Sequence, residues 1–140
     1  MEGRKFSITH KGLADTLRKA KDGITYFGGD NPLIPMETKK DNDFEFPKEC
    51  GLGKNHFKIF YDENIKAYFI QDQGDGTGTF CQIERQIVFV VMAIRIKVIE
   101  GETIVSFGLY HLVIGLVPSS ISDKNDVKIQ LIDDAHTSMH

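Results

Sequence analysis

Apolar and polar side chains alternate along much of the chain, in short runs bounded by glycine, proline and acidic residues. The period of two is clearest in residues 57–61 and 67–71, which flank the turn Asp62-Glu63-Asn64 and so predict a β-hairpin. Further strands are expected at residues 5–10, 24–27, 43–46, 87–91, 93–99, 103–107, 109–117 and 127–132. About ten short strands joined by glycine- and proline-rich turns predict an all-β sandwich or barrel.

Three segments break the strand pattern. Leu13, Leu17 and Ala20 recur at helical spacing, which leaves open either one or two helical turns near residues 13–19 or an extended loop. Residues 32–42 are polar and predict a long surface loop. Residues 133–140 have no apolar pattern and are expected to fray, so residues 1–140 are predicted to form one domain with a core of about residues 5–132.

The most apolar segment, residues 87–99, reads IVFVVMAIRIKVI. It is shorter than the roughly 20 residues that a helix needs to cross a bilayer, and Arg95 and Lys97 interrupt it. Its many β-branched side chains favour buried strand, either as a hairpin or as one long bent strand. We therefore expect no membrane insertion.

Composition argues against several classes of protein. Hydrophobic residues make up 41% and charged residues 26% of the chain, which is ordinary for a folded domain. The net charge of -3 argues against a nucleic-acid binder, which needs an excess of Lys and Arg. Cys50 and Cys81 have no further Cys or His at metal-ligand spacing, so neither a metal nor a cofactor is expected. The N-terminus lacks an apolar signal core, which favours an intracellular location, cytoplasmic or nuclear, with reduced thiols rather than a disulfide.

Five short motifs follow one another in the middle of the chain. They are Gly28 after the strand ITYF, NDFEF at residues 42–46, GKNHFKI at residues 53–59, DQGDGTGTF at residues 72–80 and EGETIVSFG at residues 100–108. In this order and spacing they resemble the forkhead-associated (FHA) family, whose SMAD/FHA-type antiparallel β-sandwich has about eleven strands. The loops at one end of that sandwich bind phosphothreonine peptides. The resemblance implies a protein-interaction module within a larger signalling or scaffold protein.

The resemblance also assigns candidate roles to individual residues. The phosphopeptide-binding positions correspond to Gly29, Gly53, Lys54, Asn55, Asp75, Thr77 and Gln82. The positions that support the loops correspond to His56, Gly28 and Gly78.

Several of these positions depart from the family pattern. Gly29 follows Gly28 where the family has the arginine that holds phosphate. Gly53 replaces a serine, and Lys54 replaces an arginine and so loses the bidentate fork. Thr77 replaces an asparagine, and Asp75 replaces a serine and is expected to repel phosphate. The resemblance therefore implies a degenerate phosphopeptide site, which serine at positions 53 and 75 is expected to repair.

Each candidate also has a plainer interpretation. Lys54 and the neighbouring amides either hold an anion or form a solvated surface. The loop QGDGTG at residues 73–78 could cradle phosphate, bind calcium through Asp72 and Asp75, or simply join two strands. The residue spacings of the Walker phosphate-binding loop and of the EF-hand calcium loop are both absent, so a tight β–β loop is favoured. His56 has no nucleophile elbow near it and is interpreted as a buried structural residue. The core aromatic residues are expected to be Phe57, Tyr61, Tyr68, Phe69, Phe80, Phe89 and Phe107.

Two functional classes remain. The favoured class is a non-enzymatic module that binds either a phosphothreonine peptide or, because the arginine and serine are missing, an unmodified protein partner. The alternative class is a small β-sandwich enzyme such as a hydrolase. Against the alternative, the sequence shows no paired carboxylates, metal cluster or catalytic triad.

Overall fold

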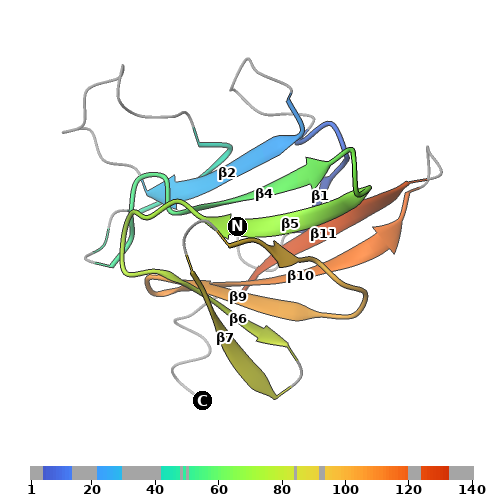
Figure 1. The fold of residues 1–140 in the computed structure, drawn as a ribbon. Helices are drawn as coiled ribbons and strands as arrows, with labels where there is room; N and C mark the ends of the chain where they lie inside the picture. Colours follow the sequence, from blue (N-terminus) through green and yellow to red (C-terminus); the bar gives the residue numbers. More distant parts are fainter. Residues whose placement is uncertain are drawn as a thin grey trace.

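The computed structural model describes residues 5–13, 22–29, 42–47, 49, 51–83, 85–91, 94–119 and 124–132, which form strands and no helix (Figure 1). The strands are β1 (Lys5–Ile8), β2 (Ile24–Gly29), β3 (Phe44–Phe46), β4 (Phe57–Asp62), β5 (Ala67–Asp72), β6 (Thr79–Ile83), β7 (Gln86–Val90), β8 (Ile96–Lys97), β9 (Thr103–Phe107), β10 (Tyr110–Pro118) and β11 (Asn125–Ile132). The predicted all-β class is confirmed. The helical turns expected near residues 13–19, most of the loop 32–42 and the tail 133–140 lie outside the described residues.

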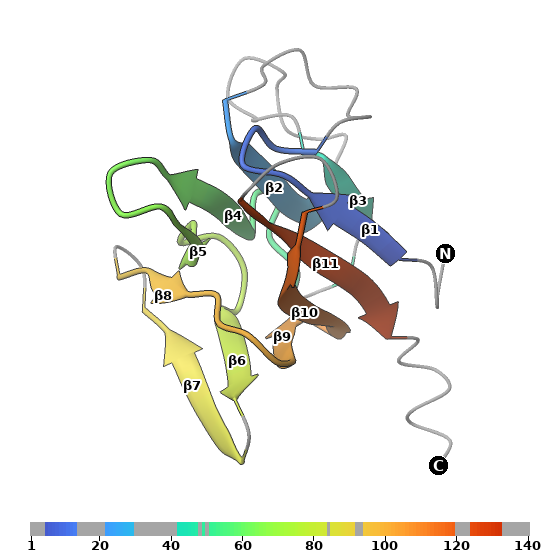
Figure 2. The ribbon, with the colours of Figure 1, turned by 90° about the vertical axis from the view of Figure 1, so that its right-hand side faces the viewer.

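The strands form two sheets that lie in separate layers (Figures 1 and 2). The six-stranded sheet has the order β1-β11-β10-β9-β6-β7, and the five-stranded sheet has the order β3-β2-β4-β5-β8. Neighbouring strands are antiparallel, except that β3 runs parallel to β2 at the edge of its sheet. Pro47 follows β3 directly, which is typical of a strand at the edge of a sheet because proline has no N–H to donate. The result is a β-sandwich.

The hydrophobic core lies between the two sheets. Phe27 of β2 stacks on Phe57 of β4 with ring centroids 4.4 Å apart, and Phe107 of the opposite sheet meets Phe57 edge-on at 4.9 Å. All three rings are fully buried. Along β4, Phe57 and Ile59 are buried while Lys58 is half-buried, so the predicted period of two corresponds to a core face and a wetter face.

The aromatic residues expected in the core divide into two groups. Phe57, Tyr68, Phe69 and Phe107 are buried, and Tyr61 is half-buried. Phe80 and Phe89 are exposed and lie in contact on the outer face of the six-stranded sheet, with ring centroids 5.0 Å apart. The core prediction was wrong for these two rings, because they occupy the outward positions of β6 and β7.

The apolar segment 87–99 also differs from its prediction. It is neither a hairpin nor one bent strand, because β7 pairs with β6 while β8 pairs with β5 in the other sheet. Just after β7, the Ile94 amide donates a hydrogen bond to the Val91 carbonyl at 3.0 Å. Among the described residues of this segment only Val90 and Val98 are buried, and Ile87 is 71% exposed. A run of apolar residues that passes from one sheet edge to another leaves its outward side chains in water.

The sandwich brings three chain segments together at one end, at the left of Figure 1. These segments are the end of β2 at Gly28 and Gly29, residues 51–56 before β4, and residues 73–78 between β5 and β6. We call them the loop end. Leu52 and Gly76 form a β-bridge within it, so the loops are joined to each other by strand-like pairing beyond the ends of the strands.

Candidate binding site at the loop end

Backbone hydrogen bonds join the segments of the loop end. Thr77 donates to the Gly51 carbonyl through both its amide (3.0 Å) and its hydroxyl group (2.9 Å). The amide of Gly29 donates to the Gly53 carbonyl at 2.9 Å, and the amide of Gln73 donates to the His56 carbonyl at 3.0 Å. The loops are therefore held in a defined arrangement by groups far apart in the sequence.

His56 lies at the centre of this arrangement and is fully buried. Its Nδ1 accepts a hydrogen bond from the Gly53 amide at 3.0 Å. Because an amide can only donate, Nδ1 carries no proton, and the ring is neutral with its proton on Nε2. Nε2 lies 2.6 Å from the Gly78 carbonyl and donates to it. His56 thus joins the two loops, in the bracing position that was expected for it.

Two glycines are required by this close packing. A Cβ on Gly28 would lie 1.8 Å from the Lys54 carbonyl oxygen, so only glycine lets β2 approach the loop. Gly76 has a φ of 88°, and a Cβ there would lie 2.6 Å from the His56 ring. The loop 73–78 is therefore a tight connection between β5 and β6, as favoured from its glycines.

The backbone amides that the sequence suggested for anion binding already donate hydrogen bonds to a carboxylate of the chain itself. The Asp75 carboxylate accepts hydrogen bonds from the Lys54 amide at 2.8 Å and from the Asn55 amide at 3.3 Å. The same oxygen, Asp75 Oδ2, accepts both hydrogen bonds. The side chain that was expected only to repel phosphate instead satisfies the amides that a phosphate oxygen would use.

The remaining candidates divide by location. Gly29 and Gly53 are buried beneath the loops, Lys54 is half-buried, and Thr77 is exposed at the surface. Gln82 is different: it pairs with Ile87 of β7 and with Ile104 of β9 on the outer face of the six-stranded sheet. The register places it three residues beyond the start of β6, so it does not join the loop end.

The geometry also corrects the proposed repair of the site. A Cβ added to Gly53 would lie 2.4 Å from the backbone carbonyl carbon of Asp75. Gly53→Ser would therefore displace the loop 73–78 instead of presenting a hydroxyl group to a ligand. Asp75 is the position at which a substitution can test the site.

Two polar residues that support the loop end, Asn42 and Glu49, were missed as functional candidates, and Asp72 was considered only as a calcium ligand. Asn42 donates to the Lys54 carbonyl at 2.6 Å and accepts from the Asn55 side chain at 3.0 Å. Glu49 accepts hydrogen bonds from the amides of Gly51 and Leu109. Asp72, which is 6% exposed, accepts from the Gly74 amide at 2.9 Å and from the Thr79 hydroxyl at 2.7 Å. An aspartate two residues before a glycine is a recognisable turn signal, and it could have predicted the structural role of Asp72.

The structure gives the carboxylates of the loop structural roles. Asp72 and Asp75 each accept hydrogen bonds from the loops themselves. Within the described ranges, no three His, Cys, Asp or Glu side chains are grouped so that they could hold a metal ion. Neither calcium nor phosphate binding follows from the arrangement of this loop.

A nucleophile and a base do meet elsewhere, on the six-stranded sheet. The Ser106 hydroxyl lies 2.7 Å from Nδ1 of His111, on neighbouring strands β9 and β10. Both side chains are half-exposed and lie on the outer face of the sheet. Acyl transfer requires an enclosed site with donors aimed at the oxyanion, and an open sheet face does not provide one.

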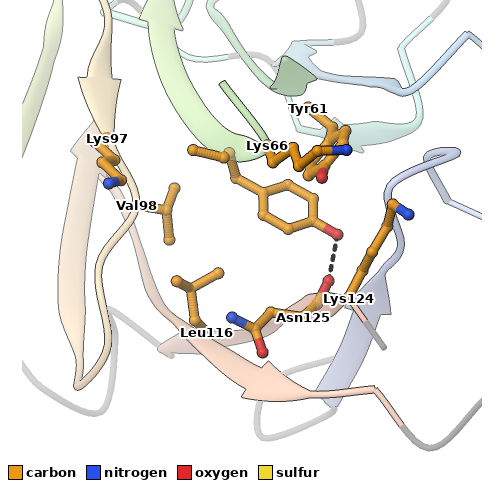
Figure 3. A pocket seen from close by; sticks show the side chains of 9 residues that line it. Tyr61, Lys66, Lys97, Val98, Leu116, Lys124 and Asn125 are labelled. Carbon is orange, nitrogen blue, oxygen red and sulfur yellow. Dashed lines mark hydrogen bonds between the residues drawn. The ribbon is translucent and has the colours of Figure 1, made fainter. Parts of the chain in front are cut away.

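A hollow of about 440 Å³ lies at the opposite end of the sandwich (Figure 3). Its lining residues are Tyr61, Lys66, Ala67, Tyr68, Lys97, Val98, Leu116, Lys124 and Asn125. The Tyr68 hydroxyl donates to the Asn125 carbonyl at 2.6 Å and so joins the two sheets. Burial, followed by the Asp126 carboxylate, raises the pKa of Tyr68 far above its usual value. The phenol therefore stays protonated and acts as a structural donor rather than a base.

Comparison of the chain with family models, with curated proteins and with solved structures finds no match. The described residues include no helix long and apolar enough to cross a bilayer.

Proposed function

We propose that this protein is a non-enzymatic, FHA-type interaction module that binds an unmodified protein segment at its loop end. The single observation that carries the proposal is the Asp75 carboxylate on the amides of Lys54 and Asn55. The two-layered sandwich and the ordered loops support the FHA-type part of the proposal, as does the buried His56 between them.

The charge of Asp75 argues against a phosphorylated ligand. A phosphate that approached the same amides would either displace the carboxylate or lie beside it. Two like charges 4 Å apart repel by about 1 kcal/mol in water and by about 4 kcal/mol at the effective dielectric constant of a protein surface. Displacement would in turn remove charge-assisted hydrogen bonds that contribute about 1.5–3 kcal/mol each. Either route weakens phosphate binding relative to a neutral ligand.

Lys54 does not reverse this balance. Its side chain carries one positive charge, without the bidentate geometry of arginine. Asp75 supplies one negative charge within hydrogen-bonding distance of the Lys54 backbone, so the local charges offset each other. The loop end instead offers neutral groups to a partner, namely the exposed Thr77 and the backbone of Gly76. Leu109, which is 63% exposed, is joined to the loop end because its amide and that of Gly51 both donate to Glu49.

A paired peptide library tests the proposal. Each sequence is presented twice, once with threonine and once with phosphothreonine, to the unchanged protein and to Asp75→Ser. We expect the unchanged protein to bind members of the library without preference for phosphate. Asp75→Ser frees the two amides and is expected to gain preference for the phosphorylated members, while Asp75→Asn, which keeps the shape of the side chain, is the matched control. A strong preference of the unchanged protein for phosphothreonine would contradict the proposal.

A further inference from the structure

One of the four sheet edges differs from the others. β1, β3, β7 and β8 are the edge strands of the two sheets. Natural edge strands avoid pairing with other molecules by being very short or by carrying charged residues or proline. β1 contains Lys5, β3 contains Glu45 and is followed by Pro47, and β8 has two residues, one of them Lys97. β7, with the sequence QIVFV, has none of these protections.

The outward side chains of β7 are also apolar and exposed. Ile87 is 71% exposed and Phe89 is 50% exposed, and Val91 just beyond the strand is 49% exposed. Phe80 of the neighbouring strand lies against Phe89 and extends this strip. Figures 1 and 2 show the β6–β7 hairpin projecting at the margin of the sandwich, with the outer edge of β7 open among the described strands.

We infer that β7 is the interface of a symmetric homodimer, in which β7 pairs antiparallel with β7 of a second copy. Only two residues separate Ile83 from its partner Gln86, so this pair flanks a tight hairpin turn and exchanges hydrogen bonds. Hydrogen-bonding directions alternate along a strand, so the backbone groups of Ile87 and Phe89 point to the open edge.

The register of the dimer follows from these directions. An antiparallel pair places directly opposite side chains on the same face, so outward residues must meet outward residues. Centring the two-fold axis on Val88 pairs all five residues of β7 and sets Ile87 of each copy opposite Phe89 of the other. Both Ile87–Phe89 pairs would then exchange backbone hydrogen bonds, and their four side chains would form one apolar cluster. The strand is thus complementary to itself, which identifies a second copy as the occupant.

The area available sets the strength of this dimer. A fully covered phenylalanine buries roughly 150–250 Å², so Ile87, Phe89 and Val91 together offer on the order of 300 Å² in each copy. With the backbone included, two copies would bury about 800 Å², below the 1,200–2,000 Å² of stable complexes. We therefore expect a weak dimer in equilibrium with monomer, present at high protein concentration.

Sedimentation velocity from about 10 μM to about 1 mM protein tests the inference, because a weak dimer has a dissociation constant on the order of micromolar to millimolar. We expect the weight-average mass to rise toward twice the monomer mass. Ile87→Lys is expected to abolish the rise, and Phe89→Glu should do the same. Ile65→Lys, at an isoleucine that is 52% exposed in the β4–β5 turn, is the matched control and should dimerise normally. Circular dichroism confirms that each variant is folded.

An isotope-filtered NMR experiment on a mixed labelled and unlabelled sample tests the register. We expect intermolecular contacts between the Ile87 methyl groups and the Phe89 ring. A protein that stays monomeric throughout the concentration range would overturn the inference. A dimer that survives Ile87→Lys, or that shows intermolecular contacts elsewhere, would overturn it equally.

Discussion

Replacing His56 by phenylalanine tests whether the loop end depends on one buried ring. The substitution keeps an aromatic ring of similar size beside Phe107, whose centroid lies 5.8 Å away. It removes both ring nitrogens. The Gly53 amide and the Gly78 carbonyl, which His56 now satisfies, would be left in a buried site without a partner.

The expected cost follows from these two groups. A buried polar group without a partner costs about 1–3 kcal/mol, and the substitution leaves two such groups. We expect His56→Phe to lower the free energy of unfolding by about 3 kcal/mol, a large share of the 5–15 kcal/mol typical of a domain. Loss of the same contacts should speed hydrogen exchange at the Gly53 amide.

Urea denaturation at pH 7 measures the first effect and NMR-detected hydrogen exchange the second. His111→Phe is the control, because His111 is half-exposed on the outer sheet face and its Ser106 partner can turn to water. It should change the free energy of unfolding by less than about 1 kcal/mol. If His56→Phe unfolds within about 0.5 kcal/mol of the unchanged protein, His56 does not brace the loops.

Three further predictions concern packing, burial and a buried carboxylate. Gly28→Ala should lower the free energy of unfolding by about 3 kcal/mol or prevent folding, because the added Cβ would overlap the Lys54 carbonyl. Urea denaturation measures this cost, and a value below about 1 kcal/mol would contradict the close approach of β2 to the loop. Burial raises the pKa of the Cys81 thiol from 9.0 to about 12. The stability that this shift contributes should be present below pH 9 and lost between pH 9 and 12. Mass spectrometry after treatment with iodoacetamide at pH 8 should show Cys81 unmodified. Rapid labelling of Cys81 in the folded protein would refute its burial. Thr79→Val should cost about 1.5–3 kcal/mol because the buried Asp72 loses its hydroxyl partner, and unchanged thermal unfolding would refute that role.

The local sequence pattern predicted the strands well where apolar and polar side chains alternate regularly, because the alternation distinguishes the core face from the solvent face. The β4–β5 hairpin followed from the alternation of residues 57–61 and 67–71, and the turns followed from glycine and aspartate. The same reasoning failed for residues 87–99. Local pattern cannot tell which sheet a strand joins, and β7 and β8 belong to different sheets. It also treats an apolar side chain as buried, whereas an edge strand can leave Ile87 and Phe89 in water.

The candidate site was predictable in position but not in chemistry. The resemblance to the forkhead-associated family implied that His56, Lys54 and the loop 73–78 lie at one end, and the structure brings them together. The role of Asp75 could not be read from residue type alone. A carboxylate repels phosphate in solution, but here it also binds two amides that lie 20 and 21 residues away in the chain. Only the folded geometry shows that the chain supplies its own anion.

The central claim is that Asp75 occupies the amides of Lys54 and Asn55 and so makes phosphate unnecessary for binding. The most direct test follows these two amide signals by ¹H–¹⁵N NMR during titration with matched threonine and phosphothreonine peptides. We predict no phosphate-dependent shift at either amide in the unchanged protein and clear phosphate-dependent shifts at both in Asp75→Ser. Phosphate-dependent shifts at Lys54 and Asn55 in the unchanged protein, equal to those in Asp75→Ser, would contradict the account.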